Sequence, residues 1–238
     1  MRKPNMFSLL GHGLSALKAG VLGLALWGAV AASAGFITTN ESRLDAIFSQ
    51  GGFASATIDT SFNAGLTVVN SALLSIDSDA AFDSLFNLSV YSGRTSNTIN
   101  MFFVDAINFC GVEGSYAGCS SNSGNVVVLV SRDVARADIG ANLEAHEIGH
   151  NLGLDHVNGS GTNLMNPYVT GNFSLDAGQI QTILASPLVQ TGSNGQRYLS
   201  ITPIAIVASI PEPQAWAMLA VGLFGVMAWA RRRKACVV

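Results

Sequence analysis

The stretch HEIGHNLGLDH, residues 146–156, decides how the rest of the chain can be arranged. If it begins as a helix, His146 and His150 are four residues apart and lie on the same face, where two imidazoles can bind one metal ion. Glu147 is next to the first histidine, close enough to take a proton from a water molecule at that metal. The pattern therefore predicts a metal site on a helix.

Gly153 and His156 extend this pattern. Glycine readily adopts the left-handed conformation that ends a helix, so the chain can turn at Gly153 and bring His156 back as a third ligand. Three neutral nitrogens with an open position are typical of a catalytic zinc site, whereas structural zinc sites are closed by four ligands. The chain has four histidines, and the remaining one, His12, lies in a predicted signal peptide.

The N-terminal residues 1–34 have the pattern of an addressing segment. They contain a basic start, an apolar run over residues 19–30 and the small-residue cleavage site Ala32-Ser33-Ala34. The apolar run is short for a membrane span, so we predict a signal peptide that signal peptidase removes, in preference to an uncleaved anchor.

The C-terminal residues 211–238 have a second such pattern. The tripeptide PEP at 211–213 is followed by an uncharged run over 214–230 and by the basic cluster RRRK at 231–234. The run is just long enough to span a membrane, with the basic cluster on the cytoplasmic side. A buried core helix would not end in four adjacent cations, so we predict a membrane anchor.

Between these segments the chain is acidic. Residues 35–210 contain five arginines, no lysine and fourteen acidic residues, so this part has a net charge of −9. Nucleic-acid binding requires cations that replace phosphate counterions, so we expect no nucleic-acid partner. No calcium-binding loop pattern is present in the sequence, and we assign no calcium.

The middle part is long enough for one domain. Residues 99–109 and 125–131 are apolar runs that predict central strands, and Asp138 is a candidate N-cap for the helix that carries the histidines. We expect the catalytic domain to span residues 35–190. Residues 191–210 are predicted to be a linker, although their second half is apolar enough for a last strand.

Cys110 and Cys119 are nine residues apart in a Gly- and Ser-rich stretch of the exported part. Oxidising conditions outside the cytoplasm favour a disulfide between them, with two free thiols as the alternative.

The stretch 146–156, with LMNP at 164–167, resembles the metzincin metalloproteases. The resemblance implies an α+β fold: a twisted, mostly parallel sheet with an antiparallel edge strand, an active-site helix and a small C-terminal subdomain after the glycine. It also implies that the substrate lies as an extended strand along the edge strand of the sheet. This edge strand would fall within residues 111–124. Carried over, the family's zinc ligands are His146, His150 and His156, its base is Glu147, its turning glycine is Gly153, and the methionine beneath its metal is Met165.

The C-terminal segment resembles the PEP-CTERM sorting signal of Gram-negative bacteria, which implies processing by an exosortase-type enzyme. The anchor would then hold the protein in the inner membrane only transiently, and the domain would reach the periplasm, the cell surface or the medium.

We therefore hypothesise an exported zinc endopeptidase that cuts protein or peptide substrates. Zinc polarises a carbonyl and acidifies water, and Glu147 acts as general base. The alternative is a surface or biofilm-matrix protein whose metzincin-like domain binds without cutting. A third hypothesis is hydrolysis of a non-peptide amide, such as a cell-wall component.

Overall fold

The computed structural model describes residues 35–88, 97–159, 161–209, 222–224 and 226. The predicted signal peptide and most of the predicted anchor lie outside these residues. In the part of the chain that is described, no helix combines the length and the apolar character that a membrane crossing requires.

The described residues form a seven-stranded main sheet in which the strand order is β1-β10-β4-β8-β7, with β2 and β9 also paired to β10. The pairs along this order are parallel except for β7, which is antiparallel to β8. The strands are β1 (Ile58–Phe62), β2 (Leu66–Val69), β4 (Thr98–Val104), β7 (Gly118–Ser120), β8 (Val126–Val130), β9 (Gln190–Thr191) and β10 (Arg197–Val207). A mostly parallel sheet with an antiparallel edge strand confirms the predicted fold class.

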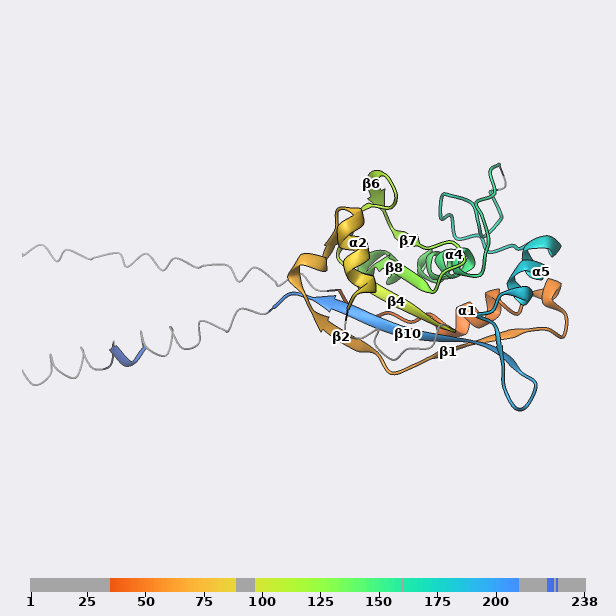
Figure 1. Ribbon diagram of the computed structural model, residues 1–238, viewed down its shortest axis with the longest axis horizontal. Coiled ribbons are helices and arrows are strands. Elements are labelled where there is room, and N and C mark those ends of the chain that lie inside the picture. The colour runs from red at the N-terminus through yellow and green to blue at the C-terminus, as the bar shows by residue number, and fades with distance from the viewer. Residues whose placement is uncertain (1–34, 89–96, 160, 210–221, 225, 227–238) are drawn as a thin grey trace, which may run out of the picture. The chain divides into compact units, whose positions relative to one another are not determined.

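A second, three-stranded sheet consists of β3 (Ser75–Ile76), β5 (Ala106–Phe109) and β6 (Glu113–Tyr116). The helices are α1 (Glu41–Ile47), α2 (Asp79–Phe86), α3 (Ser131–Val134), α4 (Gly140–Asn151) and α5 (Ala177–Ala185), with short 3-10 helices at η1 (Gly51–Phe53) and η2 (Ser71–Leu73). Figure 1 shows their arrangement around the sheet.

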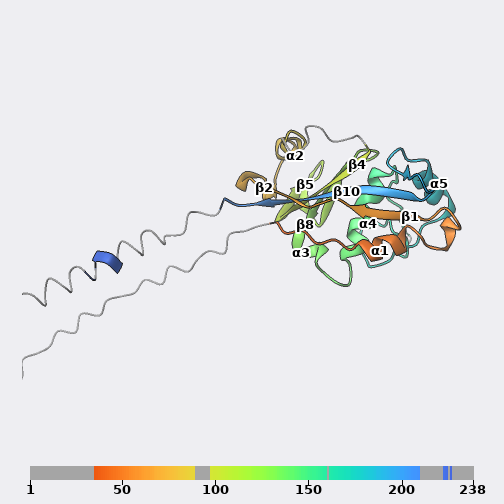
Figure 2. The ribbon, with the colours of Figure 1, turned by 90° about the horizontal axis from the view of Figure 1, so that it is seen from below.

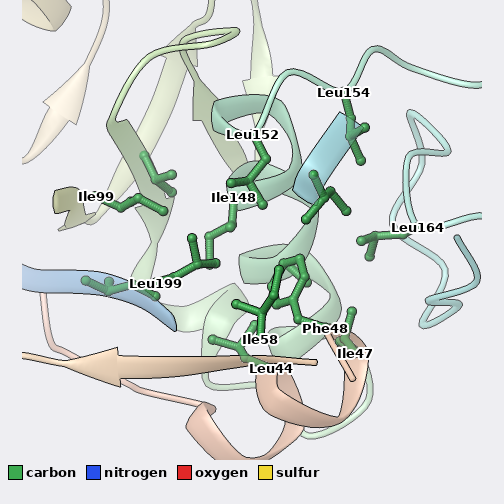
Figure 3. Packing of buried hydrophobic residues seen from close by; sticks show 14 of the residues in the cluster. Leu44, Ile47, Phe48, Ile58, Ile99, Ile148, Leu152, Leu154, Leu164 and Leu199 are labelled. Atoms are coloured by element: carbon green, nitrogen blue, oxygen red, sulfur yellow. The ribbon is translucent and has the colours of Figure 1, made fainter. Parts of the chain in front are cut away.

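The main sheet is buried on both faces, as expected for parallel strands. Met101 and Phe103 of β4 pack in one apolar cluster with residues of α1 and α4, part of which is shown in Figure 3. Phe102 and Val104 point the other way, into a cluster with residues of α2 and the second sheet. Each such side chain contributes about 1.5–3 kcal/mol when fully buried, so β4 is fixed from both sides.

Residues 191–210 are not a linker, and the domain does not end at residue 190. Residues 197–207 form β10, which pairs in parallel with β1 on one side and with β4 on the other. Both views of the ribbon show it between these two strands (Figure 1, Figure 2). Its residues from Ile201 to Ile206 are almost completely buried. The apolar second half of the segment is therefore a central strand, and the domain extends to about residue 209.

The apolar run at 99–109 divides into two strands. β4 ends at Val104 and β5 begins at Ala106, and the two strands belong to different sheets. The exposed Asp105 lies between them, and the backbone N–H groups of Asp105 and Ala106 both donate to the carbonyl of Leu74. This contact directs the chain from the main sheet into the second sheet.

Candidate metal centre and active-site cleft

Helix α4 carries the first two histidines. It begins at Gly140 with Ile139 as N-cap residue, so Asp138 is not the cap; its carboxylate instead pairs with Arg136 at 2.8 Å. His146 is buried and His150 is half-buried, with ring centroids 4.9 Å apart. The spacing of four residues thus places both imidazoles on one face of the helix, as the sequence predicts.

The turn after α4 brings the third histidine to the first two. Gly153 has φ +95°, the left-handed conformation that favours glycine. Its N–H donates to the carbonyl of His150, and the N–H of Leu154 donates to that of Gly149, which is the Schellman pattern of helix ends. The chain therefore reverses here and returns toward the face of the helix that carries His146 and His150.

The ring nitrogens of the three histidines converge. The Nε2 atom of His156 lies 3.2 Å from Nε2 of His146 and 3.1 Å from Nε2 of His150. One ligand atom from each of the three lies within 4.8 Å of the others. A group of nitrogens this compact could hold a metal ion.

Two of the imidazoles are oriented by backbone carbonyls. Nδ1 of His146 lies 2.8 Å from the carbonyl oxygen of Leu164, and Nδ1 of His150 lies 2.7 Å from that of Leu154. Since a carbonyl only accepts, each Nδ1 carries the proton and each Nε2 presents a lone pair. Burial lowers the pKa of His146 to about 4 and also lowers the pKa of His150. Both rings are therefore neutral near pH 7, as metal ligands must be.

Glu147 lies beside the histidines and faces the edge strand β7. Its side chain is only 6% exposed. The hydroxyl of Ser120 donates to Oε2 at 2.7 Å. Burial raises the pKa of the Glu147 carboxyl to about 7, and the hydrogen bond from Ser120 opposes this shift. A carboxylate with a pKa near neutral is suited to accept and release protons.

Met165 is fully buried against α4. A methyl group on Gly149 would lie only 2.7 Å from its sulfur, so a glycine is required there for this close packing. The carbonyl of Met165 accepts from the N–H of Val157, directly after His156. The predicted turn at 164–167 is thus tied to the chain that carries the third histidine.

A cleft of about 790 Å³ runs over these groups. The three histidines and Glu147 line it, together with residues 115–120 and residues 167–169. Cys110 and Cys119 also line it and form a disulfide, with Cα atoms 5.9 Å apart. The arrangement combines three histidines that could hold a metal ion, an adjacent buried carboxylate and the edge strand β7 in one groove.

Two residues of the cleft were not predicted from the sequence. Ser120 contacts Glu147 by its hydroxyl, and a methyl group on Gly118 would lie 2.5 Å from Oε1 of Glu147. Both belong to a Gly- and Ser-rich stretch without a recognisable pattern. Only the register of β7 against β8 shows which of its residues face α4.

Comparison with known families agrees with this geometry. Residues 74–157 match the family model of the reprolysin-like metallopeptidases of family M12B, and the match ends one residue after His156. Residues 209–234 match the PEP-CTERM protein-sorting motif. No curated protein matches the chain significantly. The resemblances to a metalloprotease and to a sorting signal are thereby confirmed. Over residues 74–157, which include the histidine triad, the chain is thus similar to reprolysin-like metallopeptidases, and its C-terminal motif is that of an exported, envelope-associated protein.

Proposed function

We propose that the protein is a zinc-dependent endopeptidase in which His146, His150 and His156 hold the metal and Glu147 is the general base. The observation that carries this proposal is the convergence of the three Nε2 atoms beside a buried carboxylate in an open cleft. A structural metal site would have no use for that carboxylate.

The donor set fits zinc. Three imidazoles bind zinc in catalytic sites, where a fourth position stays open for water or substrate. The second nitrogens of His146 and His150 face carbonyl oxygens, which is the usual way in which a protein orients such ligands. Soft thiolate ligands are absent from the group, since both cysteines of the cleft form a disulfide.

Zinc, when bound, supplies Lewis-acid chemistry by polarising a carbonyl and acidifying water. Glu147 takes a proton from the attacking water and passes it to the amine nitrogen that leaves as the peptide bond breaks. Burial raises the pKa of its carboxyl to about 7 in the metal-free protein, so the group can accept a proton near neutral pH. Each step thus requires a carboxylate beside the histidines, where Glu147 lies.

The substrate class follows from the edge of the sheet. β7 is at the end of the strand order and pairs only with β8 among the described strands. A peptide in extended conformation can add to such an edge through backbone hydrogen bonds, which would align its scissile bond along the cleft. We therefore infer protein or peptide substrates.

The experiment is hydrolysis of casein or of a quenched-fluorescence peptide library by the purified protein. We expect cleavage that a zinc chelator abolishes and that Glu147→Ala lowers by several orders of magnitude. Glu41→Ala, at an exposed glutamate of α1, is the matched control. Cleavage that survives both the chelator and Glu147→Ala refutes the proposal. If neither the wild type nor the variants hydrolyse any substrate, the binding role is favoured. Cleavage of non-peptide amides alone would favour hydrolysis of a cell-wall component.

We also propose the division of the chain that the terminal segments suggest. Signal peptidase removes residues 1–34, residues 35–209 form the catalytic domain, and residues 211–238 serve as a transient inner-membrane anchor until an exosortase-type enzyme processes them. Mass spectrometry of the exported form tests both processing events at once, because the mass shows whether residues 1–34 are removed and an intact C-terminus in the released protein would exclude processing by an exosortase-type enzyme.

A further inference from the structure

The three residues of strand β7 divide by the alternation of side chains along a strand. Gly118 and Ser120 face α4, where both approach the carboxylate of Glu147. Cys119 points to the opposite face of the sheet, packs in the second apolar cluster and is bonded to Cys110. The strand therefore presents two contacts to Glu147 and is anchored covalently from behind.

Glu147 depends on these contacts for its orientation. A glutamate side chain has several rotatable bonds, and neither ion pair among the described residues involves Glu147. The Ser120 hydroxyl holds Oε2, while the missing side chain at Gly118 leaves room for Oε1. The two carboxylate oxygens thus have different surroundings: Oε2 accepts the hydroxyl of Ser120, and Oε1 lies against Gly118, where a side chain would displace it.

We propose that Ser120 is a positioning residue for the general base: its hydroxyl fixes one oxygen of Glu147 so that the other is directed at the attacking water. This inference rests on the proposed function. β7 aligns the substrate by its backbone and orients the base by Ser120, so substrate and base are placed by the same three residues. Their relative position is then set by the backbone of one short strand.

The contribution of such a contact can be estimated. A hydrogen bond to a charged group is worth about 1.5–3 kcal/mol, which corresponds to roughly a ten- to hundredfold change in rate. Loss of orientation acts on the chemical step, so the change belongs in kcat, with KM retained.

The test compares Ser120→Ala with Ser120→Thr, which keeps a hydroxyl, and with Ser61→Ala, the same substitution on β1 at the other edge of the sheet. We expect Ser120→Ala to lower kcat ten- to hundredfold with unchanged KM and zinc content. Ser120→Thr should restore most of kcat, and Ser61→Ala should match the wild type.

A double-mutant cycle with Glu147→Ala gives a second readout that does not depend on activity. In metal-free protein, the shifts of the urea unfolding midpoint should be non-additive, because Ser120→Ala removes nothing further when Glu147 is absent. Additive shifts, a rise in KM alone, or failure of threonine to rescue kcat would each overturn the inference. If the wild type shows no chelator-sensitive cleavage, the proposed function itself fails, and the cycle still reports whether the contact exists.

Discussion

Gly153→Ala tests whether the turn after α4 sets the position of the third histidine. An alanine at φ +95° is strained by about 1–2 kcal/mol, since its Cβ approaches the following carbonyl. Space is not the obstacle: the added methyl group would lie 3.5 Å from Ser123 and from Thr182, which is ordinary contact. The expected cost therefore comes from the backbone conformation alone.

Whether this cost lowers the stability of the fold or weakens zinc binding depends on how freely His156 can move. His156 is exposed, and its ring lies within hydrogen-bonding distance of the other two histidines. In the metal-free protein the turn is held by the buried Leu152 and Leu154 on either side of Gly153, so part of the strain lowers the free energy of unfolding. The exposed His156 can move away from the other two histidines without metal but not with zinc bound, so the rest of the strain weakens zinc binding. We therefore expect the zinc Kd of Gly153→Ala to rise by up to roughly 5- to 30-fold, which corresponds to 1–2 kcal/mol.

Gly195→Ala is the control, because Gly195 has φ +81° in the hairpin between β9 and β10 and no atom lies within 4 Å of its added methyl group. It should lower the free energy of unfolding by about 1–2 kcal/mol and leave the zinc Kd unchanged. Competition with a chromogenic chelator measures Kd, and urea unfolding followed by circular dichroism measures stability. If Gly153→Ala binds zinc as tightly as the wild type, our account of the turn is wrong.

Three further predictions concern the edge strand and the boundary of the domain. Gly118→Ala would place a methyl group 2.5 Å from Oε1 of Glu147, so kcat in a peptide assay should fall at least about tenfold; a normal kcat contradicts this contact. Reduction of the disulfide between Cys110 and Cys119, with a sequence separation of 9, should lower the free energy of unfolding by about 2.5 kcal/mol and reduce activity by loosening β7. The variant with both cysteines replaced by alanine should not respond to reductant. A chain truncated after residue 190 should give no cooperative unfolding transition by circular dichroism, whereas one that ends at residue 209 should; equal transitions would refute the central place of β10.

Helix α4 and the convergence of its histidines with His156 could be predicted from the sequence because their determinants are local. A spacing of four residues on a helix and a glycine at its end fix the relative positions of His146, His150 and His156 within eleven residues. The buried strand β8 was equally evident, since a short β-branched run without polar interruption indicates burial on both faces. In each case neighbours in the sequence are neighbours in space.

The strand β10 could not be placed in this way. Its apolar residues resemble those of a tail that leads to a membrane, and nothing local shows that residues 197–207 pair with β1, about 140 residues earlier. Ser120 was missed for the same reason. Its contact with Glu147 depends on the register of β7 against β8, and a shift of one residue would turn it to the other face.

The helix cap shows a different limit. Asp138 is a good cap residue by type, but Arg136 is two residues away and its guanidinium binds the same carboxylate. The helix begins at Gly140 instead, where a side chain would contact the carbonyl of Val134. Two local preferences competed, and the sequence alone does not rank them.

The place of β10 also determines when the site can be completed. Among the described strands, β1 and β4 do not pair with each other, and each pairs with β10. The apolar cluster beneath α4 includes Leu199 and Ile201, so the helix that carries two of the proposed metal ligands lacks part of its support until β10 is present. The sorting motif begins at residue 209, where the N–H of Ser209 still donates to Ser71. Because a cut within β10 would remove a central strand, we expect removal of the sorting segment to occur after Ser209, which would release the domain without opening its sheet.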